Sequence, residues 1–292
     1  MFEGSIVALV TPMDTSGNVD YNALEELVEF HIDNGTQGIV AVGTTGESAT
    51  LPTDEHIEVI KRTVEFAKGR IPIIAGTGAN ATAEAVELSQ RAAEVGVDGQ
   101  LTVVPYYNKP QQSGILAHFQ AVAEATDLPT ILYNVPGRTV ADMADWVVEE
   151  LAQHPNIVGL KDATGDLSRL ASLKPKVPED FVLLSGEDPT AYEFLKQGGH
   201  GVISVTANIV PAEMARLCQL CGQGKLAEAE QLNESIADLH ELLFIEPNPV
   251  MPKWALFKMQ RIASATLRLP LVEPELNSQE RLEKAMQQSG LI

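Results

Sequence analysis

The feature that most constrains the fold is a regular alternation of short apolar runs with longer amphipathic stretches. Eight such runs occupy residues 6–10, 38–42, 71–75, 100–104, 130–134, 157–161, 181–185 and 201–205. Each run is almost continuously apolar rather than alternating between apolar and polar residues. This pattern is typical of parallel strands that are buried on both faces. We therefore expect eight buried strands.

The stretches between the runs carry apolar residues at helical spacing. We expect helices over residues 21–34, 54–68, 81–95, 114–125 and 142–153. Thr53 and Thr82 stand where the side chains that cap a helix N-terminus are expected. Three of the helices are followed by a glycine, a residue that commonly ends a helix: Gly35, Gly69 and Gly96.

Alternating strands and helices predict a parallel sheet, and eight units predict that the sheet closes into a (β/α)8 TIM barrel. This α/β barrel would fill residues 1–224. The strand pattern then stops, and residues 225–244, 249–260 and 278–289 are expected to be helical. We therefore expect a barrel catalytic domain followed by a small C-terminal helical domain, residues 225–292.

A doubly wound open sheet is the alternative fold. It would usually carry a glycine-rich phosphate-binding turn after its first strand. Here the first run leads into Thr11-Pro-Met-Asp14, which contains no glycine. The segment Gly76-Thr-Gly-Ala-Asn80 is richer in glycine but lacks the third glycine of the dinucleotide fingerprint. The barrel is the better prediction.

The chain of 292 residues carries a formal net charge of −20. This charge argues against a nucleic-acid partner and against an anionic membrane surface. It also means that local cations must capture any anionic substrate. The N-terminal residues do not resemble a signal peptide, no apolar run could span a bilayer, and cysteines are few. We therefore expect a cytoplasmic protein.

The sequence predicts no metal site. The six histidines, at positions 31, 56, 118, 154, 200 and 240, do not form pairs with ligand spacing. Cys218 and Cys221 have a redox or metal spacing, but they lie in a helical pattern and no second pair completes a zinc site. We expect two thiols on a packed helix.

Enzymes with a TIM barrel place their reacting groups at the C-terminal ends of the strands. Lys161 stands at such an end and is the only lysine in a strand candidate. Burial disfavours an ammonium group, so the pKa of a lysine falls there and its neutral amine can attack a carbonyl. The alternative is an ion pair between Lys161 and a carboxylate such as Asp188.

Tyr133 ends the strand before Lys161, where a phenol could move protons during imine chemistry. Alternatively, its ring could simply cap the barrel core. Thr44 and Tyr107 could hydrogen-bond to this phenol and complete a proton relay. Arg138 lies in a Pro-Gly loop at the barrel mouth and could bind a carboxylate with two hydrogen bonds, or it could be a solvated loop residue.

Three segments together resemble the dihydrodipicolinate synthase and N-acetylneuraminate lyase family. They are Gly43-Thr-Thr-Gly-Glu47, Tyr133-Asn-Val-Pro-Gly-Arg-Thr139 and Gly159-Leu-Lys-Asp-Ala-Thr-Gly165, and the likeness covers residues 6–269. Within the family, Thr44-Thr45 with Arg138, and Tyr106-Tyr107, resemble the synthase branch. The lyase branch typically has serine-threonine in the first loop and lacks this arginine.

The resemblance implies that Lys161 forms a Schiff base with pyruvate, whose carboxylate binds the backbone at Thr44 and Thr45. The resulting enamine would attack L-aspartate-4-semialdehyde, an early step of lysine and diaminopimelate biosynthesis. Arg138 would hold the carboxylate of this second substrate. No cofactor is implied, because the lysine itself serves as the electron sink.

The remaining implied roles concern proton transfer and the lining of the site. Tyr133, with Thr44 and Tyr107, would move the protons. Gly186 and Ile203 match positions that line the pyruvate site in the family.

The resemblance also implies a homotetramer, a dimer of dimers, that L-lysine inhibits at the tight-dimer interface. The matching positions are Ser48, Ala49, His56, Asn80, Glu84 and Tyr106. Thr53 departs from the pattern, because sensitive bacterial relatives often have histidine there. The alternative is that these residues serve only the starts of two helices.

Two other functions compete with this one. A sister aldolase or dehydratase would act on a 2-keto-3-deoxy sugar acid, a reading that Arg138 disfavours. A catalytically inactive barrel could serve as a binding protein, but it would not need Lys161, Tyr133 and Thr44 together.

Overall fold

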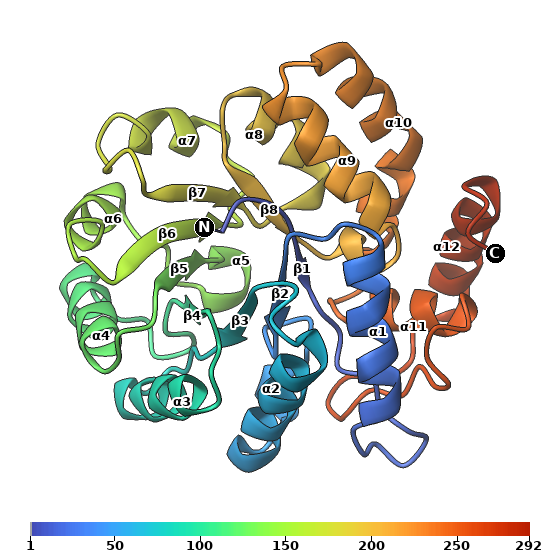
Figure 1. The fold of residues 1–292 in the computed structure, drawn as a ribbon, viewed down its shortest axis with the longest axis horizontal. Helices are drawn as coiled ribbons and strands as arrows, with labels where there is room; N and C mark the ends of the chain where they lie inside the picture. Colours follow the sequence, from blue (N-terminus) through green and yellow to red (C-terminus); the bar gives the residue numbers. More distant parts are fainter. Residues whose placement is uncertain (1) are drawn as a thin grey trace.

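The computed structural model describes residues 2–292, and in it eight parallel strands close into a barrel in chain order (Figure 1). The strands are β1 (Gly4–Ala8), β2 (Gly38–Ala41), β3 (Ile73–Gly76), β4 (Gly99–Val103), β5 (Thr130–Asn134), β6 (Ile157–Asp162), β7 (Val182–Ser185) and β8 (Gly201–Ser204). The barrel closes where β1 pairs with β8. The predicted (β/α)8 fold is confirmed.

The first strand lies two residues earlier than predicted. The apolar run at residues 6–10 continues past the strand, because Leu9 and Val10 are buried without belonging to β1. Hydrophobicity indicates burial, whereas a strand also requires backbone pairing with a neighbouring strand. The backbone N–H of Leu9 still donates to the carbonyl of Val40, but that of Val10 donates to the side chain of Asn208, and the pairing ends there.

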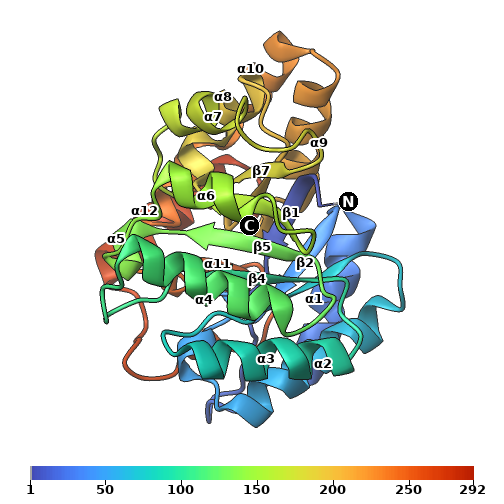
Figure 2. The same cartoon turned by 90° about the vertical axis from the view of Figure 1, so that its left-hand side faces the viewer.

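Helices surround the barrel (Figure 1). They are α1 (Tyr21–Asp33), α2 (Thr53–Ala67), α3 (Thr82–Glu94), α4 (Gln112–Glu124), α5 (Pro136–Thr139), α6 (Asp145–Leu151), α7 (Ser168–Leu173), α8 (Ala191–Lys196) and α9 (Pro211–Gly222). Short 3-10 turns η1 (Ser48–Thr50), η2 (Asp188–Thr190) and η3 (Thr206–Asn208) follow β2, β7 and β8. Figure 2 shows α3 and α4 side by side along the outside of the barrel.

The predicted helix caps were wrong. Thr53 and Thr82 are the first residues of α2 and α3, while Pro52 and Ala81 occupy the cap positions without a side-chain bond. The hydroxyl of Thr82 instead forms a hydrogen bond of 3.0 Å with Nδ1 of His118 on α4. Local sequence rules assign the side chain of Thr82 to helix capping, but in the fold it contacts the neighbouring helix. The three glycines that follow helices do adopt positive φ, as expected.

Apolar side chains that point inward fill the barrel. Ile6, Val40, Ile74, Leu101 and Ile131 are among those that form one buried cluster inside it. Two larger clusters lie between the barrel and its helices. Since successive side chains of a strand point to opposite faces, this packing fixes which residues reach the mouth of the barrel.

The C-terminal segment contains α10 (Leu226–Leu242), α11 (Val250–Lys258) and α12 (Leu276–Gln288), as predicted. Met251 and Trp254 of α11 belong to the same core cluster as Val7 of β1 and Leu24 of α1. The division at residue 224 stays a prediction, because one core includes residues from both sides of it. Within residues 2–292, no helix is long and apolar enough to cross a bilayer.

Candidate active site

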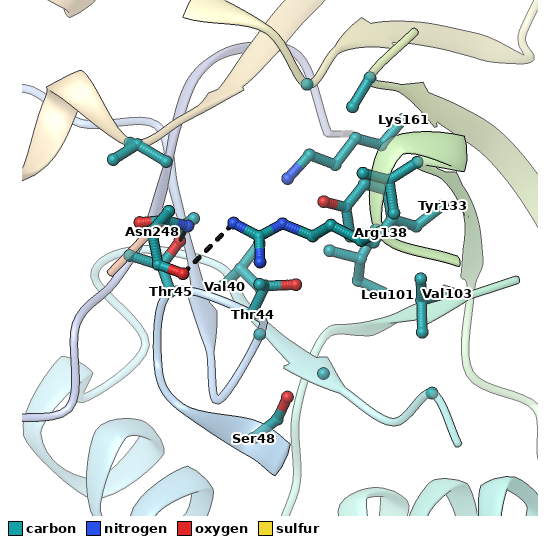
Figure 3. A pocket seen from close by; sticks show the side chains of 18 of the residues that line it. Val40, Thr44, Thr45, Ser48, Leu101, Val103, Tyr133, Arg138, Lys161 and Asn248 are labelled. Carbon is teal, nitrogen blue, oxygen red and sulfur yellow. Dashed lines mark hydrogen bonds between the residues drawn. The ribbon is translucent and has the colours of Figure 1, made fainter. Parts of the chain in front are cut away.

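A cavity of about 400 Å³ opens at the C-terminal ends of the strands (Figure 3). Most of the residues predicted from the strand ends meet there. The lining includes Thr44, Thr45, Ser48, Tyr133, Arg138, Lys161 and Gly186. The pairing of β5 with β6 sets Tyr133 directly beside Lys161. The cavity is therefore the candidate active site.

Lys161 is 5% exposed, and its Nζ lies 4.3 Å from the centre of the Tyr133 ring. No ion pair of Lys161 is present among residues 2–292. The carboxylate of Asp188, its suggested partner, instead accepts hydrogen bonds from the backbone N–H groups of Val205 and Thr206. The ion-pair alternative is therefore wrong.

The electrostatic surroundings of Lys161 favour its neutral form. Burial is the largest influence and lowers the pKa of Lys161 to about 8. Asp188 and Glu187 raise this pKa, while Arg138 lowers it further. Close to neutral pH, a useful fraction of this amine is therefore unprotonated and nucleophilic.

Gly186, which follows β7, leaves room for the lysine. A Cβ atom at this position would lie 2.7 Å from Cε of Lys161 and 2.8 Å from Cβ of Ala163. Any side chain there would force the lysine to move. The glycine thus shapes the cavity wall beside the amine of Lys161.

Tyr133 is almost fully buried, and burial raises the pKa of its phenol. Arg138 and the hydroxyl of Thr44 both act in the opposite direction. The phenol is therefore protonated near neutral pH. The Thr44 hydroxyl is its hydrogen-bond partner and the amine of Lys161 lies over its ring, a placement that suits a group that exchanges protons.

Arg138 extends from the short helix α5 toward the centre of the cavity (Figure 3). Its Nη2 donates a hydrogen bond of 3.2 Å to the carbonyl oxygen of Asn248. The Asn248 side chain, in turn, donates to Oγ1 of Thr45 at 3.0 Å. The remaining donors of the guanidinium point into the cavity, where they can hold a carboxylate.

Sequence reasoning missed Asn248 as a residue of the site. It lies 110 positions after Arg138 in the segment between α10 and α11. In the sequence, Asn248 lies in the segment Glu246-Pro-Asn-Pro249, whose prolines are typical of a boundary between helices and do not indicate a contact with the barrel mouth.

Two predicted residues lie outside the cavity lining. Tyr107 is 85% exposed, and its backbone has a φ of 74°. Ile203 is buried inside the barrel in the same apolar cluster as Tyr133. Neither one is brought to the cavity surface within this chain.

The six residues matched to a lysine site lie around the starts of α2 and α3. Nε2 of His56 forms a hydrogen bond of 2.7 Å with the carbonyl of Gly76, and burial lowers the pKa of this histidine. Burial and nearby Glu84 both raise the pKa of Tyr106, which contacts the backbone of Asn80. Ser48 lies at the cavity edge and Ala49 is exposed.

The remaining reactive side chains lie apart from the cavity. Cys218 is buried in α9, and burial raises the pKa of its thiol, which makes it a poor nucleophile. No cluster of three or more potential metal ligands occurs in the part of the chain that the structure describes.

The fold and the cavity together define a class of protein, a (β/α)8-barrel enzyme with a buried lysine at the C-terminal mouth of the barrel. Comparison with known proteins identifies the family within this class. The chain belongs to the dihydrodipicolinate synthetase family, whose model matches residues 1–289.

Individual relatives agree along the full length of the chain. The 4-hydroxy-tetrahydrodipicolinate synthase of Pseudoalteromonas atlantica is 63% identical over 100% of both chains. The dihydrodipicolinate synthase of Acinetobacter baumannii, solved in complex with pyruvate, is 49% identical over 100% of both chains, with a TM-score of 0.98. A homologous synthase from Cyanidioschyzon merolae, solved with lysine bound, is 40% identical, covers 100% and 99% of the two chains, and has a TM-score of 0.97.

Proposed function

We propose that this protein condenses pyruvate with L-aspartate-4-semialdehyde to give 4-hydroxy-tetrahydrodipicolinate, the first committed step of diaminopimelate and lysine biosynthesis. The observation that carries the proposal is the buried Lys161 beside Tyr133 in a cavity that also contains Thr44, Thr45 and Arg138. The names of full-length relatives at high identity support the same reaction.

The first half of the reaction attaches pyruvate to the enzyme. The backbone N–H groups of Thr44 and Thr45 bind the pyruvate carboxylate, and the neutral amine of Lys161 adds to the ketone carbon. Tyr133 gives a proton to the departing hydroxyl, so that water leaves and an iminium forms. The methyl group then loses a proton to give an enamine.

The second half joins the two substrates. The enamine carbon attacks the aldehyde carbon, and the new alkoxide takes up a proton to become a hydroxyl group. Arg138 holds the carboxylate of the second substrate during this step. The amino group of that substrate then adds to the imine carbon and displaces the amine of Lys161, which closes the ring and frees the enzyme.

Borohydride trapping tests this proposal. Pyruvate with borohydride should add a reduced pyruvyl group to the peptide that contains Lys161, as peptide mass spectrometry would reveal. Lys161→Ala should abolish this labelling, whereas Lys258→Ala on the surface should retain it. Labelling of a different lysine in active enzyme would refute the assignment.

A substrate screen separates this reaction from that of a sister aldolase. With pyruvate as the first substrate, L-aspartate-4-semialdehyde should be strongly preferred over sugar-derived aldehydes. Arg138 supports this expectation, because its guanidinium can pair with a carboxylate that those aldehydes lack near the reacting carbon. Equal turnover of a sugar aldehyde would favour a 2-keto-3-deoxy acid as the natural substrate.

We further propose that L-lysine inhibits the enzyme at the site formed by Ser48, Ala49, His56, Asn80, Glu84 and Tyr106. Glu84 would accept the α-ammonium group, while Asn80 and Tyr106 would bond to the carboxylate. Burial keeps His56 neutral, so that its free ring nitrogen can form a polar contact with the far amine. The relative solved with lysine bound supports this ligand.

The lysine proposal predicts an inhibition that depends on Glu84. Turnover at saturating pyruvate should fall as L-lysine rises, and Glu84→Thr should relieve this inhibition. Glu87→Thr is the matched control, because Glu87 lies about one turn later on α3 and is 62% exposed. Because Thr53 removes one polar partner, we expect affinity several-fold weaker than in sensitive relatives, by about 1 kcal/mol. If millimolar L-lysine does not change the turnover of the parent enzyme, these residues have only a structural role.

Assembly into a homotetramer, a dimer of dimers, is proposed with the same function, as is a cytoplasmic location. The high exposure of Tyr107 within one chain supports an assembled enzyme, since a relay residue must contact the phenol that it serves.

A further inference from the structure

The loop that carries Thr44 and Thr45 belongs to neither a strand nor a helix. It turns tightly, with Gly46 N and Glu47 N donating to the carbonyls of Gly43 and Thr44 at 3.1 Å each. Glu47 ends this turn with φ 58° and ψ 38°, a left-handed conformation that residues other than glycine adopt rarely. Such a conformation persists where the surrounding structure holds it.

The side chain of Glu47 points away from the cavity and forms a buried ion pair. Its Oε1 lies 2.5 Å from Nζ of Lys253, and both side chains are 0% exposed. Its Oε2 accepts a hydrogen bond of 3.0 Å from the backbone N–H of Arg268. Both oxygens of the carboxylate are thus bound by residues that come after the barrel.

The same C-terminal segment contacts the loop at one further point and also binds the part of the chain that follows it. Asn248, just before α11, donates to the hydroxyl of Thr45. The guanidinium of Arg268 binds the carboxylate of Glu55 in the first turn of α2, as well as the backbone of Thr50 between the loop and that helix. The C-terminal segment thus holds the loop from outside the barrel, in addition to the hydrogen bond of 2.8 Å that Oγ1 of Thr11, just after β1, donates to the carbonyl of Gly46.

A gain in folding stability does not explain well why Glu47 and Lys253 form a buried ion pair. A buried ion pair is often no more stabilising than well-packed apolar side chains, because both charges lose their hydration. What a charged pair supplies is a defined geometry, since an unpaired charge at either position would be strongly disfavoured. Burial lowers the pKa of Lys253, and Glu47 opposes this shift.

We propose that Lys253 and Glu47 are positioning residues for pyruvate, which hold the Thr44–Thr45 loop so that helix α11 sets the affinity for this substrate. The inference rests on the proposed function, because it assigns the loop to the pyruvate carboxylate. Neither residue touches the cavity, so each acts through the loop backbone.

The test compares Lys253→Met, Glu47→Gln and the double variant with the parent enzyme. In both single variants, the KM for pyruvate should rise by about tenfold or more, while the KM for the aldehyde substrate changes little. Pyruvate should also raise the melting temperature of each variant less than that of the parent. The double variant should lose no more pyruvate affinity than the worse single variant, since one interaction is removed.

Lys258→Met is the matched control. Lys258 lies on the same helix and pairs with Glu283 at 2.6 Å, but this pair links α11 to α12 and is partly exposed. Its loss should leave the KM for pyruvate unchanged. Thermal melting of all variants would separate lost stability from lost affinity.

The outcomes are distinct. A lower melting temperature with an unchanged KM for pyruvate would limit the pair to stabilising the fold and overturn the inference. If Lys253→Met does not fold, the KM of Glu47→Gln for pyruvate decides the question. Glutamine has nearly the same size as glutamate and keeps one acceptor oxygen, so this variant disturbs the fold less. If the parent itself is not trapped by pyruvate and borohydride, the proposed function fails, independently of these variants.

Discussion

Lys161 is buried, and its pKa decides what fraction of its amine is neutral and able to act as a nucleophile. A lysine with its ordinary pKa would be neutral in roughly one molecule in 3,000 at pH 7, whereas a pKa of about 8 leaves roughly one in ten neutral. The ring of Tyr133 attracts the ammonium form, but burial outweighs this attraction.

The lowered pKa predicts how imine formation depends on pH. The rate of borohydride-dependent labelling at subsaturating pyruvate should rise by about tenfold per pH unit below pH 8 and then level off. Rapid-quench labelling across pH 6 to 10 would measure this profile. A rate that continues to rise to pH 10 would mean that Lys161 titrates like a solvated lysine.

The same shift affects stability with a defined sign. Because burial lowers the pKa of Lys161 in the folded state, the unfolded chain binds more protons between about pH 8 and 10.5. The lysine therefore destabilises the fold most fully below pH 8, and this cost diminishes as the pH rises through that window.

At the scale of elements, the ends of neighbouring strands meet closely around the amine of Lys161. β6 carries Lys161 into the barrel mouth, and the residue that follows β7 has no side chain to obstruct it. The loop after β2 and the helix α5 contribute the groups that face the lysine across the cavity. Each element contributes one or two side chains, as is usual for barrel enzymes.

This packing predicts a specific effect of Gly186→Ala. The added methyl group would meet Cε of Lys161 at 2.7 Å, so the lysine must move and labelling by pyruvate should slow by about tenfold or more. Gly222→Ala is the matched control, since a Cβ there meets nothing within 4 Å. Normal labelling by Gly186→Ala would mean that the lysine tolerates the displacement.

At the scale of the whole molecule, the net charge of −20 opposes the approach of pyruvate, which is an anion. Arg138 and Lys161 supply positive charge within the cavity itself. High salt should therefore lower the KM for pyruvate moderately, because screening weakens the repulsive field of the surface more than the short contacts inside.

The exposure of Tyr107 leads to a prediction about assembly. If this tyrosine completes the relay of a neighbouring subunit, then mixing Lys161→Ala chains with Tyr107→Phe chains should restore part of the activity in hybrid dimers. Activity measured after verified subunit exchange provides the test. Hybrids that stay inactive would exclude Tyr107 from a relay shared between subunits.

The sequence by itself determined the barrel, because eight buried strands and their helices leave a periodic record in the order of apolar residues. The sequence also predicted that four side chains meet at the barrel mouth, because parallel strands bring their C-terminal ends to one place. They are Lys161, Tyr133, Thr44 and Arg138. These inferences depend on local pattern and on a simple topological rule, and both are readable along the chain.

Only the tertiary structure decided the contacts between residues far apart in the chain. Glu47 and Lys253 are separated by 206 positions, and neither local spacing nor hydrophobicity indicates that an exposed-type residue on α11 is fully buried against the loop. The sequence did not indicate three other contacts for the same reason. They are the hydrogen bonds of Asp188 to the backbone, of Asn248 to Thr45, and of Thr82 to His118. A hydrogen bond or an ion pair forms when the fold brings two groups together, and sequence order carries no direct record of that distance.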